Sequence, residues 1–211
     1  MKRRIEMKIF CFIVSAVFAY CVSGLNPAII MSKAIYKKDI REYGSGNPGF
    51  TNFKRVFGNK YAWFVFALDI LKGAVISVSA GLLFRQYVGS WQFGVAYAGI
   101  FALLGHAFPV FYGFKGGKGF LVCLSTLWFI DWRAGAIAAV VLTVLLLTVK
   151  YMSLSSMSAL IVGAVFVAVF GAGWAVSLTY AVCVLFVVIR HRENIIRLIR
   201  GTESKFSFGK K

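Results

Sequence analysis

The chain has 211 residues, of which 60% are hydrophobic and 15% charged, and its mean hydropathy is +0.79. One soluble domain of this length could not bury so much apolar surface, so the composition excludes an ordinary soluble fold and predicts an all-α integral membrane protein. The net charge of +17 does not predict a nucleic-acid partner, because most basic residues lie in short loops between apolar runs, which indicates membrane topology.

The chain begins with a basic stretch and an apolar run that resemble a signal peptide, but a small-residue cleavage site is missing. A crossing takes about 20 apolar residues, which predicts helices over residues 9–31, 61–84 and 91–112. The run at 120–147 is interrupted at 131–133, and the run at 156–188 is interrupted at 171–174. Each interruption predicts two shorter helices that meet at the membrane surface. The sequence therefore predicts a bundle of seven transmembrane helices.

The basic loops predict the orientation of this bundle. Most Lys and Arg occur in residues 32–60, in 113–119, near Lys150 and after residue 189. Seven crossings place these segments on one face, which the positive-inside rule assigns to the cytoplasm, with the N-terminus outside and the C-terminus inside. Five crossings would give the same sidedness. The basic residues among the first eight do not fit this orientation, because it places them outside.

The first polar segment on this face is "GSGNPGFTNFKRVFG", residues 44–58. Its glycines and proline prevent a regular helix and expose backbone amides beside hydroxyl, amide and guanidinium donors. Such donors suit a phosphate or an acyl oxygen. An ordinary turn that caps the next helix is the alternative.

The second polar segment, "GHAFPVFYGFKGGKG" at residues 105–119, lacks the spacing of a nucleotide-binding P-loop. Its glycines allow close approach of an anion, and Lys115 and Lys118 add positive charge where a helix is predicted to begin. A basic topology loop would explain the lysines equally well. His106 alone is better explained as a polar contact within the bundle.

The third polar segment is "HRENIIRLIRGTESK", residues 191–205. Its periodicity is typical of an amphipathic helix at the membrane surface, which leaves His191 and Asn194 on one helix face unexplained. Within the second apolar run, Asp69 and Lys72 are three residues apart, which predicts a membrane-embedded ion pair that faces its partner or a cavity. The four cysteines are isolated in apolar segments and predict packing roles, with no disulfide and no metal site.

Together these segments resemble the acyl-phosphate:glycerol-3-phosphate acyltransferase family of bacterial membranes. The resemblance covers nearly the whole chain as one membrane acyltransferase domain, residues 1–211. Its motifs occur in the family's order: GSGNPGFTNFKR at 44–55, DILKG at 69–73, GHAFPVFYGFKGGKG at 105–119, YMSLSS at 151–156 and HRENIIRLIRGTESK at 191–205. Two departures are bulkier than usual: Phe50 replaces an alanine, and "FLVC" follows the glycine loop where "VAT" is common.

The resemblance implies a seven-helix fold with a cytoplasm-facing site in the bacterial inner membrane. It implies transfer of a fatty acyl group from acyl phosphate to glycerol 3-phosphate, without a metal or other cofactor, and functional coupling to an acyl-phosphate-forming enzyme. Membrane lipid is the further partner. Acyl-CoA and acyl carrier protein are not expected as donors, because neither histidine is followed by an aspartate at the HxxxxD spacing.

The resemblance also implies roles for individual residues. The acyl phosphate and its developing oxyanion are assigned to Ser45, Asn47, Thr51, Asn52, Arg55, His191 and Asn194. Glycerol 3-phosphate is assigned to His106, Lys115, Gly116, Gly117, Lys118 and Gly119. The expected catalytic set is Ser45, Arg55, Lys118, His191 and Asn194. We predict that a phosphate oxygen of the substrate takes the hydroxyl proton, with His191 as the alternative base. Glu203 is expected to be a structural partner for a cation.

A transporter for an organic phosphate would also need a basic cavity among helices. It would be expected to show two related halves, and the sequence contains no internal repeat. A structural lipid-binding protein would explain the basic face and the terminal amphipathic helix but not the segment from Ser45 to Arg55.

Overall fold

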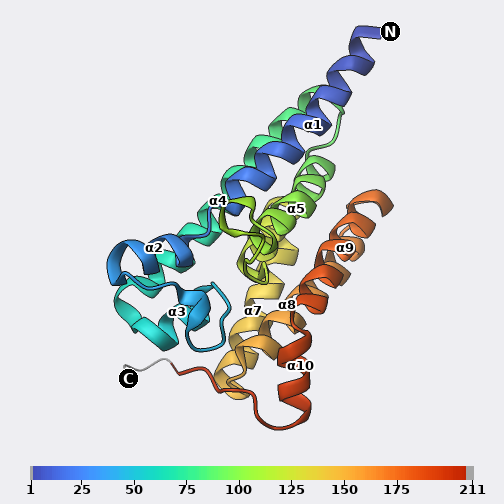
Figure 1. The fold of residues 1–211 in the computed structure, drawn as a ribbon. Coiled ribbons are helices and arrows are strands. Elements are labelled where there is room, and N and C mark those ends of the chain that lie inside the picture. The colour runs from blue at the N-terminus through green and yellow to red at the C-terminus, as the bar shows by residue number, and fades with distance from the viewer. Residues whose placement is uncertain (1, 208–211) are drawn as a thin grey trace.

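The computed structural model describes residues 2–207, and all regular structure in that range is helical (Figure 1). Short 3-10 turns η1 (Ile40–Glu42) and η2 (Val110–Tyr112) lie in two of the loops. The α-helices are α1 (Lys2–Gly24), α2 (Pro27–Tyr36), α3 (Phe50–Phe57), α4 (Asn59–Tyr87), α5 (Trp91–Ala107), α6 (Phe120–Ile130), α7 (Trp132–Thr148), α8 (Met152–Val169), α9 (Trp174–Arg190) and α10 (Arg192–Ile199).

The long helices have the length and composition of membrane spans. Within the described range, four spans qualify by length and hydropathy, or five if α9 and α10, which are bent by 57° at their junction, count as one. The first of the four, 2–36, joins α1 and α2. Helices α6 and α7 are apolar but shorter. The all-helical, multi-pass character predicted from composition is therefore confirmed.

Both predicted interruptions are present, and each has a local cause. Asp131 ends α6 and caps α7, because its carboxylate accepts a hydrogen bond from the backbone N–H of Arg133 at 2.9 Å. Between α8 and α9, Gly171 and Gly173 adopt positive φ angles of 77° and 86°, which glycine tolerates best.

Two of the predicted spans are present as candidate spans, 2–36 and 91–112, but neither is one continuous helix. The expected helix at 9–31 is divided after Gly24, because Asn26 accepts a hydrogen bond from the N–H of Ile29 and Pro27 starts a new helix, α2. The expected helix at 91–112 ends at Ala107, and the chain then folds back along the end of α5. In the second case hydropathy alone could not detect the end of the helix, since the loop at 108–114 contains several aromatic residues.

Helix α6 does not reach across a bilayer. Its 11 residues span about 16 Å, roughly half of the 30 Å hydrocarbon core. Figure 1 shows the loop that precedes α6 in the middle of the molecule, between the ends of long helices. Gly117 and Gly119 of the glycine-rich segment are buried, whereas residues 113–115 are exposed.

Small residues let the helices approach one another closely. A methyl group at Gly73 of α4 would lie 2.8 Å from Cβ of Ser125 in α6, and one at Gly81 would lie 2.6 Å from the Trp91 ring. Cys11, Cys123 and Cys183 are buried as expected, whereas Cys21 is exposed, which corrects its predicted packing role.

The C-terminal tail returns to the helices near α3. The N–H of Phe206 donates to the carbonyl of Lys150 at 2.6 Å, and the Phe206 side chain belongs to one hydrophobic cluster with buried residues of α2, α3 and α4. Figure 1 shows the tail crossing the end of the bundle opposite the start of α1. Segments that are far apart in the sequence thus enclose one region at this end.

Candidate active site

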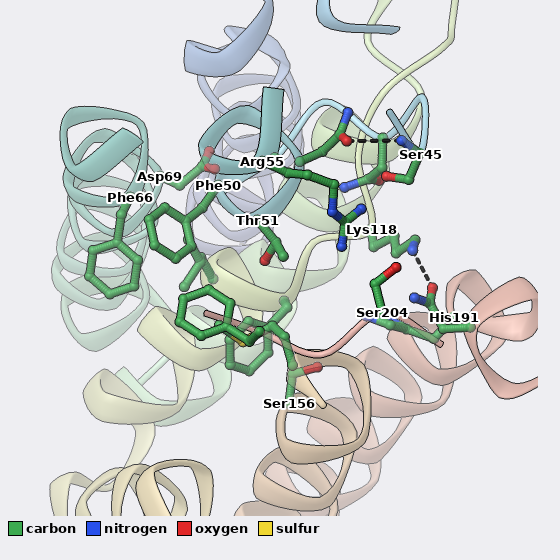
Figure 2. A pocket seen from close by; sticks show the side chains of 18 of the residues that line it. Ser45, Phe50, Thr51, Arg55, Phe66, Asp69, Lys118, Ser156, His191 and Ser204 are labelled. Atoms are coloured by element: carbon green, nitrogen blue, oxygen red, sulfur yellow. Dashed lines mark hydrogen bonds between the residues drawn. The ribbon is translucent and has the colours of Figure 1, made fainter. Parts of the chain in front are cut away.

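A cavity of about 550 Å³ lies where the three polar motifs meet. The loop and helix at 44–55 form one side, Lys118 and Gly119 precede α6, and the α9–α10 junction and the tail close another side. Figure 2 shows Arg55 and Lys118 near one another, with Phe50 and Phe66 at the opposite end. The predicted site residues on the cavity wall are Ser45, Asn47, Thr51, Asn52, Arg55, His106, Lys118, Gly119, His191 and Asn194.

Asn52 holds the first motif in shape. Its side-chain oxygen accepts from the N–H of Ser45 at 2.9 Å, and its side-chain nitrogen donates to the carbonyl of Tyr43 at 2.9 Å. Gly44 allows this contact, since its φ is +62° and a methyl group there would collide with the Asn52 oxygen. The buried Asn52 amide therefore orders the loop that carries Ser45. Asn52 was expected to contact the substrate, and these bonds indicate instead that it positions the loop.

Asn52→Ala is expected to destabilise the protein by about 1–3 kcal/mol, because buried backbone groups of the loop lose their partners. This corresponds to a fall in Tm of roughly 3–10 °C for a chain of this size. Thermal unfolding in detergent measures it. Asn47→Ala is the matched control, as the described structure shows no hydrogen bond from the Asn47 side chain. Equal Tm values for the two variants would contradict this role.

The glycines of the second motif serve close packing. The N–H groups of Gly116 and Gly117 donate to the carbonyls of Ala107 and His106, each at 3.0 Å. A methyl group on Gly116 would collide with the His106 carbonyl, and one on Gly117 would collide with Nε2 of His106. The two N–H groups are thus not directed at an anion. The expectation that they bind glycerol 3-phosphate through their amides is therefore wrong.

The second motif is divided between two cavities. Lys118 and Gly119 line the 550 Å³ cavity next to the N-terminus of α6, where backbone N–H groups favour an anion. Lys115 and Gly116 line a separate cleft of about 540 Å³ with Asp39 and Arg41. The Arg41 side chain is paired with Asp39 at 2.7 Å and donates to the carbonyls of Tyr112 and Lys115. The structure therefore brings Lys118, and not Lys115, to the other two motifs.

A hydrogen-bond chain joins the second and third motifs. Lys118 donates to the side-chain oxygen of Asn194, whose nitrogen donates to Glu203 at 2.7 Å. Glu203 also accepts from Ser153 at 2.7 Å and pairs with Arg197 at 2.7 Å. Burial opposes ionisation of Glu203, but these hydrogen bonds keep its pKa below the ordinary value. Its predicted pairing with a cation is confirmed.

Lys118 and Arg55 give the cavity its positive charge. Burial, and to a smaller extent Arg197, lowers the pKa of Lys118 to about 8. The described residues provide no ion pair or hydrogen bond for the Arg55 guanidinium, which reaches into the cavity in Figure 2. Two cations without a carboxylate in direct contact favour an anionic ligand.

His191 has a defined orientation at the α9–α10 junction. Its side chain is 5% exposed, and Nδ1 lies 2.8 Å from the carbonyl of Val187. Because a carbonyl oxygen only accepts, Nδ1 carries a proton and Nε2 is the nitrogen left for a ligand. The cavity thus presents His191 close to Asn194, as their spacing on one helix face predicted.

The other end of the cavity is apolar. Phe50 lies 5.1 Å from Trp63 and 5.4 Å from Phe66 between ring centroids, and Phe206 of the tail lies 6.2 Å away. Leu142 and Leu146 of α7 complete this side. The sequence motifs included Phe50 but not the others, since single aromatic and aliphatic residues carry no signal in so apolar a chain. This end matches a fatty chain in chemistry.

Asp69, Lys72 and His106 form a buried polar cluster beside the cavity. The predicted pair is confirmed, with 2.7 Å between Oδ1 of Asp69 and Nζ of Lys72, and Lys72 also lies 3.0 Å from Nδ1 of His106. Asp69 and His106 both line the cavity. Within residues 2–207, no group of three or more His, Cys, Asp or Glu side chains has the arrangement of a metal site.

Comparisons with known proteins find relatives over nearly the whole chain. Residues 13–201 match the family model described as glycerol-3-phosphate acyltransferase. A glycerol-3-phosphate acyltransferase of Francisella philomiragia is 39% identical over 189 residues, which cover 90% of either chain. Its counterpart from Thermoanaerobacter pseudethanolicus is 39% identical over 194 residues, 92% of this chain and 94% of that one.

Solved structures show the same fold. The crystal structure of PlsY (YgiH), an integral membrane glycerol 3-phosphate acyltransferase, in its glycerol 3-phosphate form has a TM-score of 0.85 at 32% identity, and the match covers 93% of this chain and 96% of that one. Its lysophosphatidic acid form has a TM-score of 0.80 at the same identity, with 93% and 95% covered. With the sequence motifs gathered around one cationic and apolar cavity, these matches show that the chain belongs to the glycerol-3-phosphate acyltransferase family.

Proposed function

We propose that this chain transfers a fatty acyl group from acyl phosphate to the 1-hydroxyl of sn-glycerol 3-phosphate, giving lysophosphatidic acid and inorganic phosphate in bacterial phospholipid synthesis. The single observation that supports this most is the composition of the cavity. Arg55 and Lys118 at one end, neither in an ion pair within the described residues, are continuous with Phe50, Phe66 and Leu146 at the other. An acyl phosphate has the same division into an anionic head and an apolar chain.

The reaction needs little more than alignment of two anionic substrates. The hydroxyl oxygen attacks the acyl carbon, the bond from that carbon to the phosphate oxygen breaks, and inorganic phosphate leaves with the electron pair. The leaving group is weakly basic, so neither a strong general acid nor an acyl-enzyme is required. Hydrogen-bond donors near the carbonyl would stabilise the developing oxyanion.

We assign the acyl phosphate head to Ser45, Asn47, Thr51 and Arg55, with His191 and Asn194 across the cavity. We assign the phosphate of glycerol 3-phosphate to Lys118, Gly119 and the N-terminus of α6. Lys115 is not assigned to it because it lines the other cleft, and the amides of Gly116 and Gly117 are not because they donate to carbonyls of α5. The hydroxyl proton goes to a phosphate oxygen of the substrate in this proposal. Nε2 of His191 is the alternative acceptor, because its Nδ1 donates to Val187.

We further propose one domain over residues 1–211 with seven crossings, α1 and α4 to α9, of which α6 is a half-length span. The basic loops support a bacterial inner-membrane location with the site and the C-terminus at the cytoplasmic face and the N-terminus outside. That face is also where acyl phosphate would arrive from an acyl-phosphate-forming enzyme. Labelling of single cysteines at residues 3 and 205 in intact cells would test the two termini.

The activity is tested with purified protein in detergent, palmitoyl phosphate, glycerol 3-phosphate and a metal chelator. We expect release of one phosphate for each lysophosphatidic acid formed, without added metal or coenzyme. Turnover with palmitoyl-CoA and none with palmitoyl phosphate would contradict the proposal. Uptake of glycerol 3-phosphate into protein-containing liposomes without turnover would support the transporter alternative instead.

A further inference from the structure

Phe50 lies at the centre of a group of four aromatic rings at the apolar end of the cavity (Figure 2). Its ring centroid is 5.1 Å from that of Trp63, 5.4 Å from that of Phe66 and 6.2 Å from that of Phe206. Trp63 and Phe66 also pack on one another at 5.8 Å. Rings at these separations are in contact, so an acyl chain cannot pass between Phe50 and any of the other three.

Other buried side chains enclose the same end. Phe50 is 6% exposed and Phe206 is 7% exposed, and both belong to one hydrophobic cluster with Leu121 and Leu146, which are 8% and 9% exposed. All four line the cavity, while Trp63, which is half exposed, forms part of its outer wall. The small accessible surface of the four shows that the apolar end is narrow. A chain that enters it must fit the space that these side chains leave.

Two of the four rings come from segments outside the long helices. Phe50 is the first residue of α3, and Thr51 and Arg55 of the same short helix also line the cavity. Phe206 belongs to the C-terminal tail, where its N–H donates to the carbonyl of Lys150 at 2.6 Å. The first motif and the tail therefore determine together how much room the apolar end has.

We propose that Phe50 and Phe206 are specificity-determining residues that set an upper limit to the length of the acyl chain that the cavity accepts. Their rings occupy space that further methylene groups would need, and overfilling a packed apolar site is unfavourable. An alanine at position 50, which is usual in this family, would leave the space of the ring to the chain. The inference rests on the proposed function for the identity of the ligand as an acyl phosphate.

Competition among acyl phosphates tests this limit. Purified protein in mixed micelles receives equal amounts of lauroyl, palmitoyl, stearoyl and behenoyl phosphate with glycerol 3-phosphate. Mass spectrometry of the lysophosphatidic acids formed gives the ratios of kcat/KM, and we expect these values to fall at the long end of the series. Phe50→Ala and Phe206→Ala should each raise the behenoyl-to-palmitoyl ratio roughly tenfold. Unchanged ratios in both variants would overturn the inference.

Two further variants separate a steric limit from a general disturbance of the site. Leu142→Phe adds bulk to the cavity from α7, so it should lower the behenoyl-to-palmitoyl ratio. Phe64→Ala is the matched control, because this ring of α4 is 59% exposed and is not among the described residues that line the cavity. Its ratio should stay within about twofold of the unmodified protein. A shift as large as that of Phe50→Ala would refute the role of the cavity wall.

Binding without turnover makes the test independent of the reaction. Dodecyl-, hexadecyl- and docosylphosphonate have an anionic head and an alkyl chain but no acyl group to transfer, and equilibrium binding to the full chain in lipid nanodiscs measures their affinities. We expect docosylphosphonate to bind more weakly than hexadecylphosphonate and to gain affinity in Phe50→Ala. Equal affinities in both proteins would contradict the limit. Should no acyl phosphate act as a donor, the proposed function would fail, while phosphonate binding would still decide whether Phe50 limits the chain.

Discussion

Lys118→Ala is expected to raise the KM for glycerol 3-phosphate roughly 30-fold, which corresponds to about 2 kcal/mol for a charge-assisted hydrogen bond to phosphate. The KM for acyl phosphate should change much less, because its head is assigned chiefly to Ser45, Thr51 and Arg55 of the first motif. Steady-state kinetics with each substrate varied in turn measures both values.

The same lysine predicts a pH dependence. Because burial lowers its pKa to about 8, Lys118 loses its proton as the pH rises through that value, and the neutral amine no longer attracts phosphate. The kcat/KM for glycerol 3-phosphate should therefore be constant below about pH 7 and fall above about pH 8. Lys118→Arg keeps its charge throughout this range, so its profile should remain flat.

Lys115→Ala is the informative comparison, since its side chain lies at the separate cleft with Arg41. We expect a change in KM of less than about threefold. If Lys115→Ala had the larger effect, the phosphate of glycerol 3-phosphate would have to lie in that second cleft, and the assignment to Lys118 and Gly119 would be wrong.

Glu203→Ala is expected to lower kcat/KM about 100-fold although its carboxylate need not contact substrate. The change removes the acceptor that orients Asn194 and leaves Arg197 without its partner. Asn194 then no longer holds Lys118 at the cavity wall. Kinetics and thermal unfolding, measured together, separate the loss of orientation from a general loss of stability.

Glu193→Ala is the matched control, because this exposed acidic residue lies on α10, the helix of Asn194 and Arg197, and its carboxylate has no hydrogen bond or ion pair in the described structure. Glu203→Ala and Asn194→Ala should not be additive, since both disrupt one chain of hydrogen bonds. Fully additive losses in the double variant would show that Glu203 acts independently of Asn194.

Much of the fold and of the site could be predicted from sequence because the signals are local. The helix breaks at Asp131 and Gly171 depend on a charge or on glycines within a few residues. The i, i+3 spacing of Asp69 and Lys72 likewise predicts their contact, since helix geometry brings such side chains together.

The helix ends within the predicted spans depend on other information. The end of α5 at Ala107 is set by contacts with the returning loop, in which Gly116 and Gly117 donate to the last carbonyls of the helix. Hydropathy could not detect it, because the loop is as aromatic as the helix. The apolar end of the cavity escaped prediction for a similar reason, as Trp63 and Phe66 differ in no local respect from lipid-facing residues.

The sequence by itself thus determined the membrane class, the helix interruptions and the three polar motifs, because hydropathy, charge and glycine content act over short stretches of chain. Only the tertiary structure decided which members of each motif share a cavity. It separated Lys118 from Lys115, directed the amides of Gly116 and Gly117 toward α5, and placed His106 between Lys72 and the glycine loop. Those outcomes depend on how helices that are distant in the sequence pack together. A local pattern in one segment does not indicate which other segment it will contact.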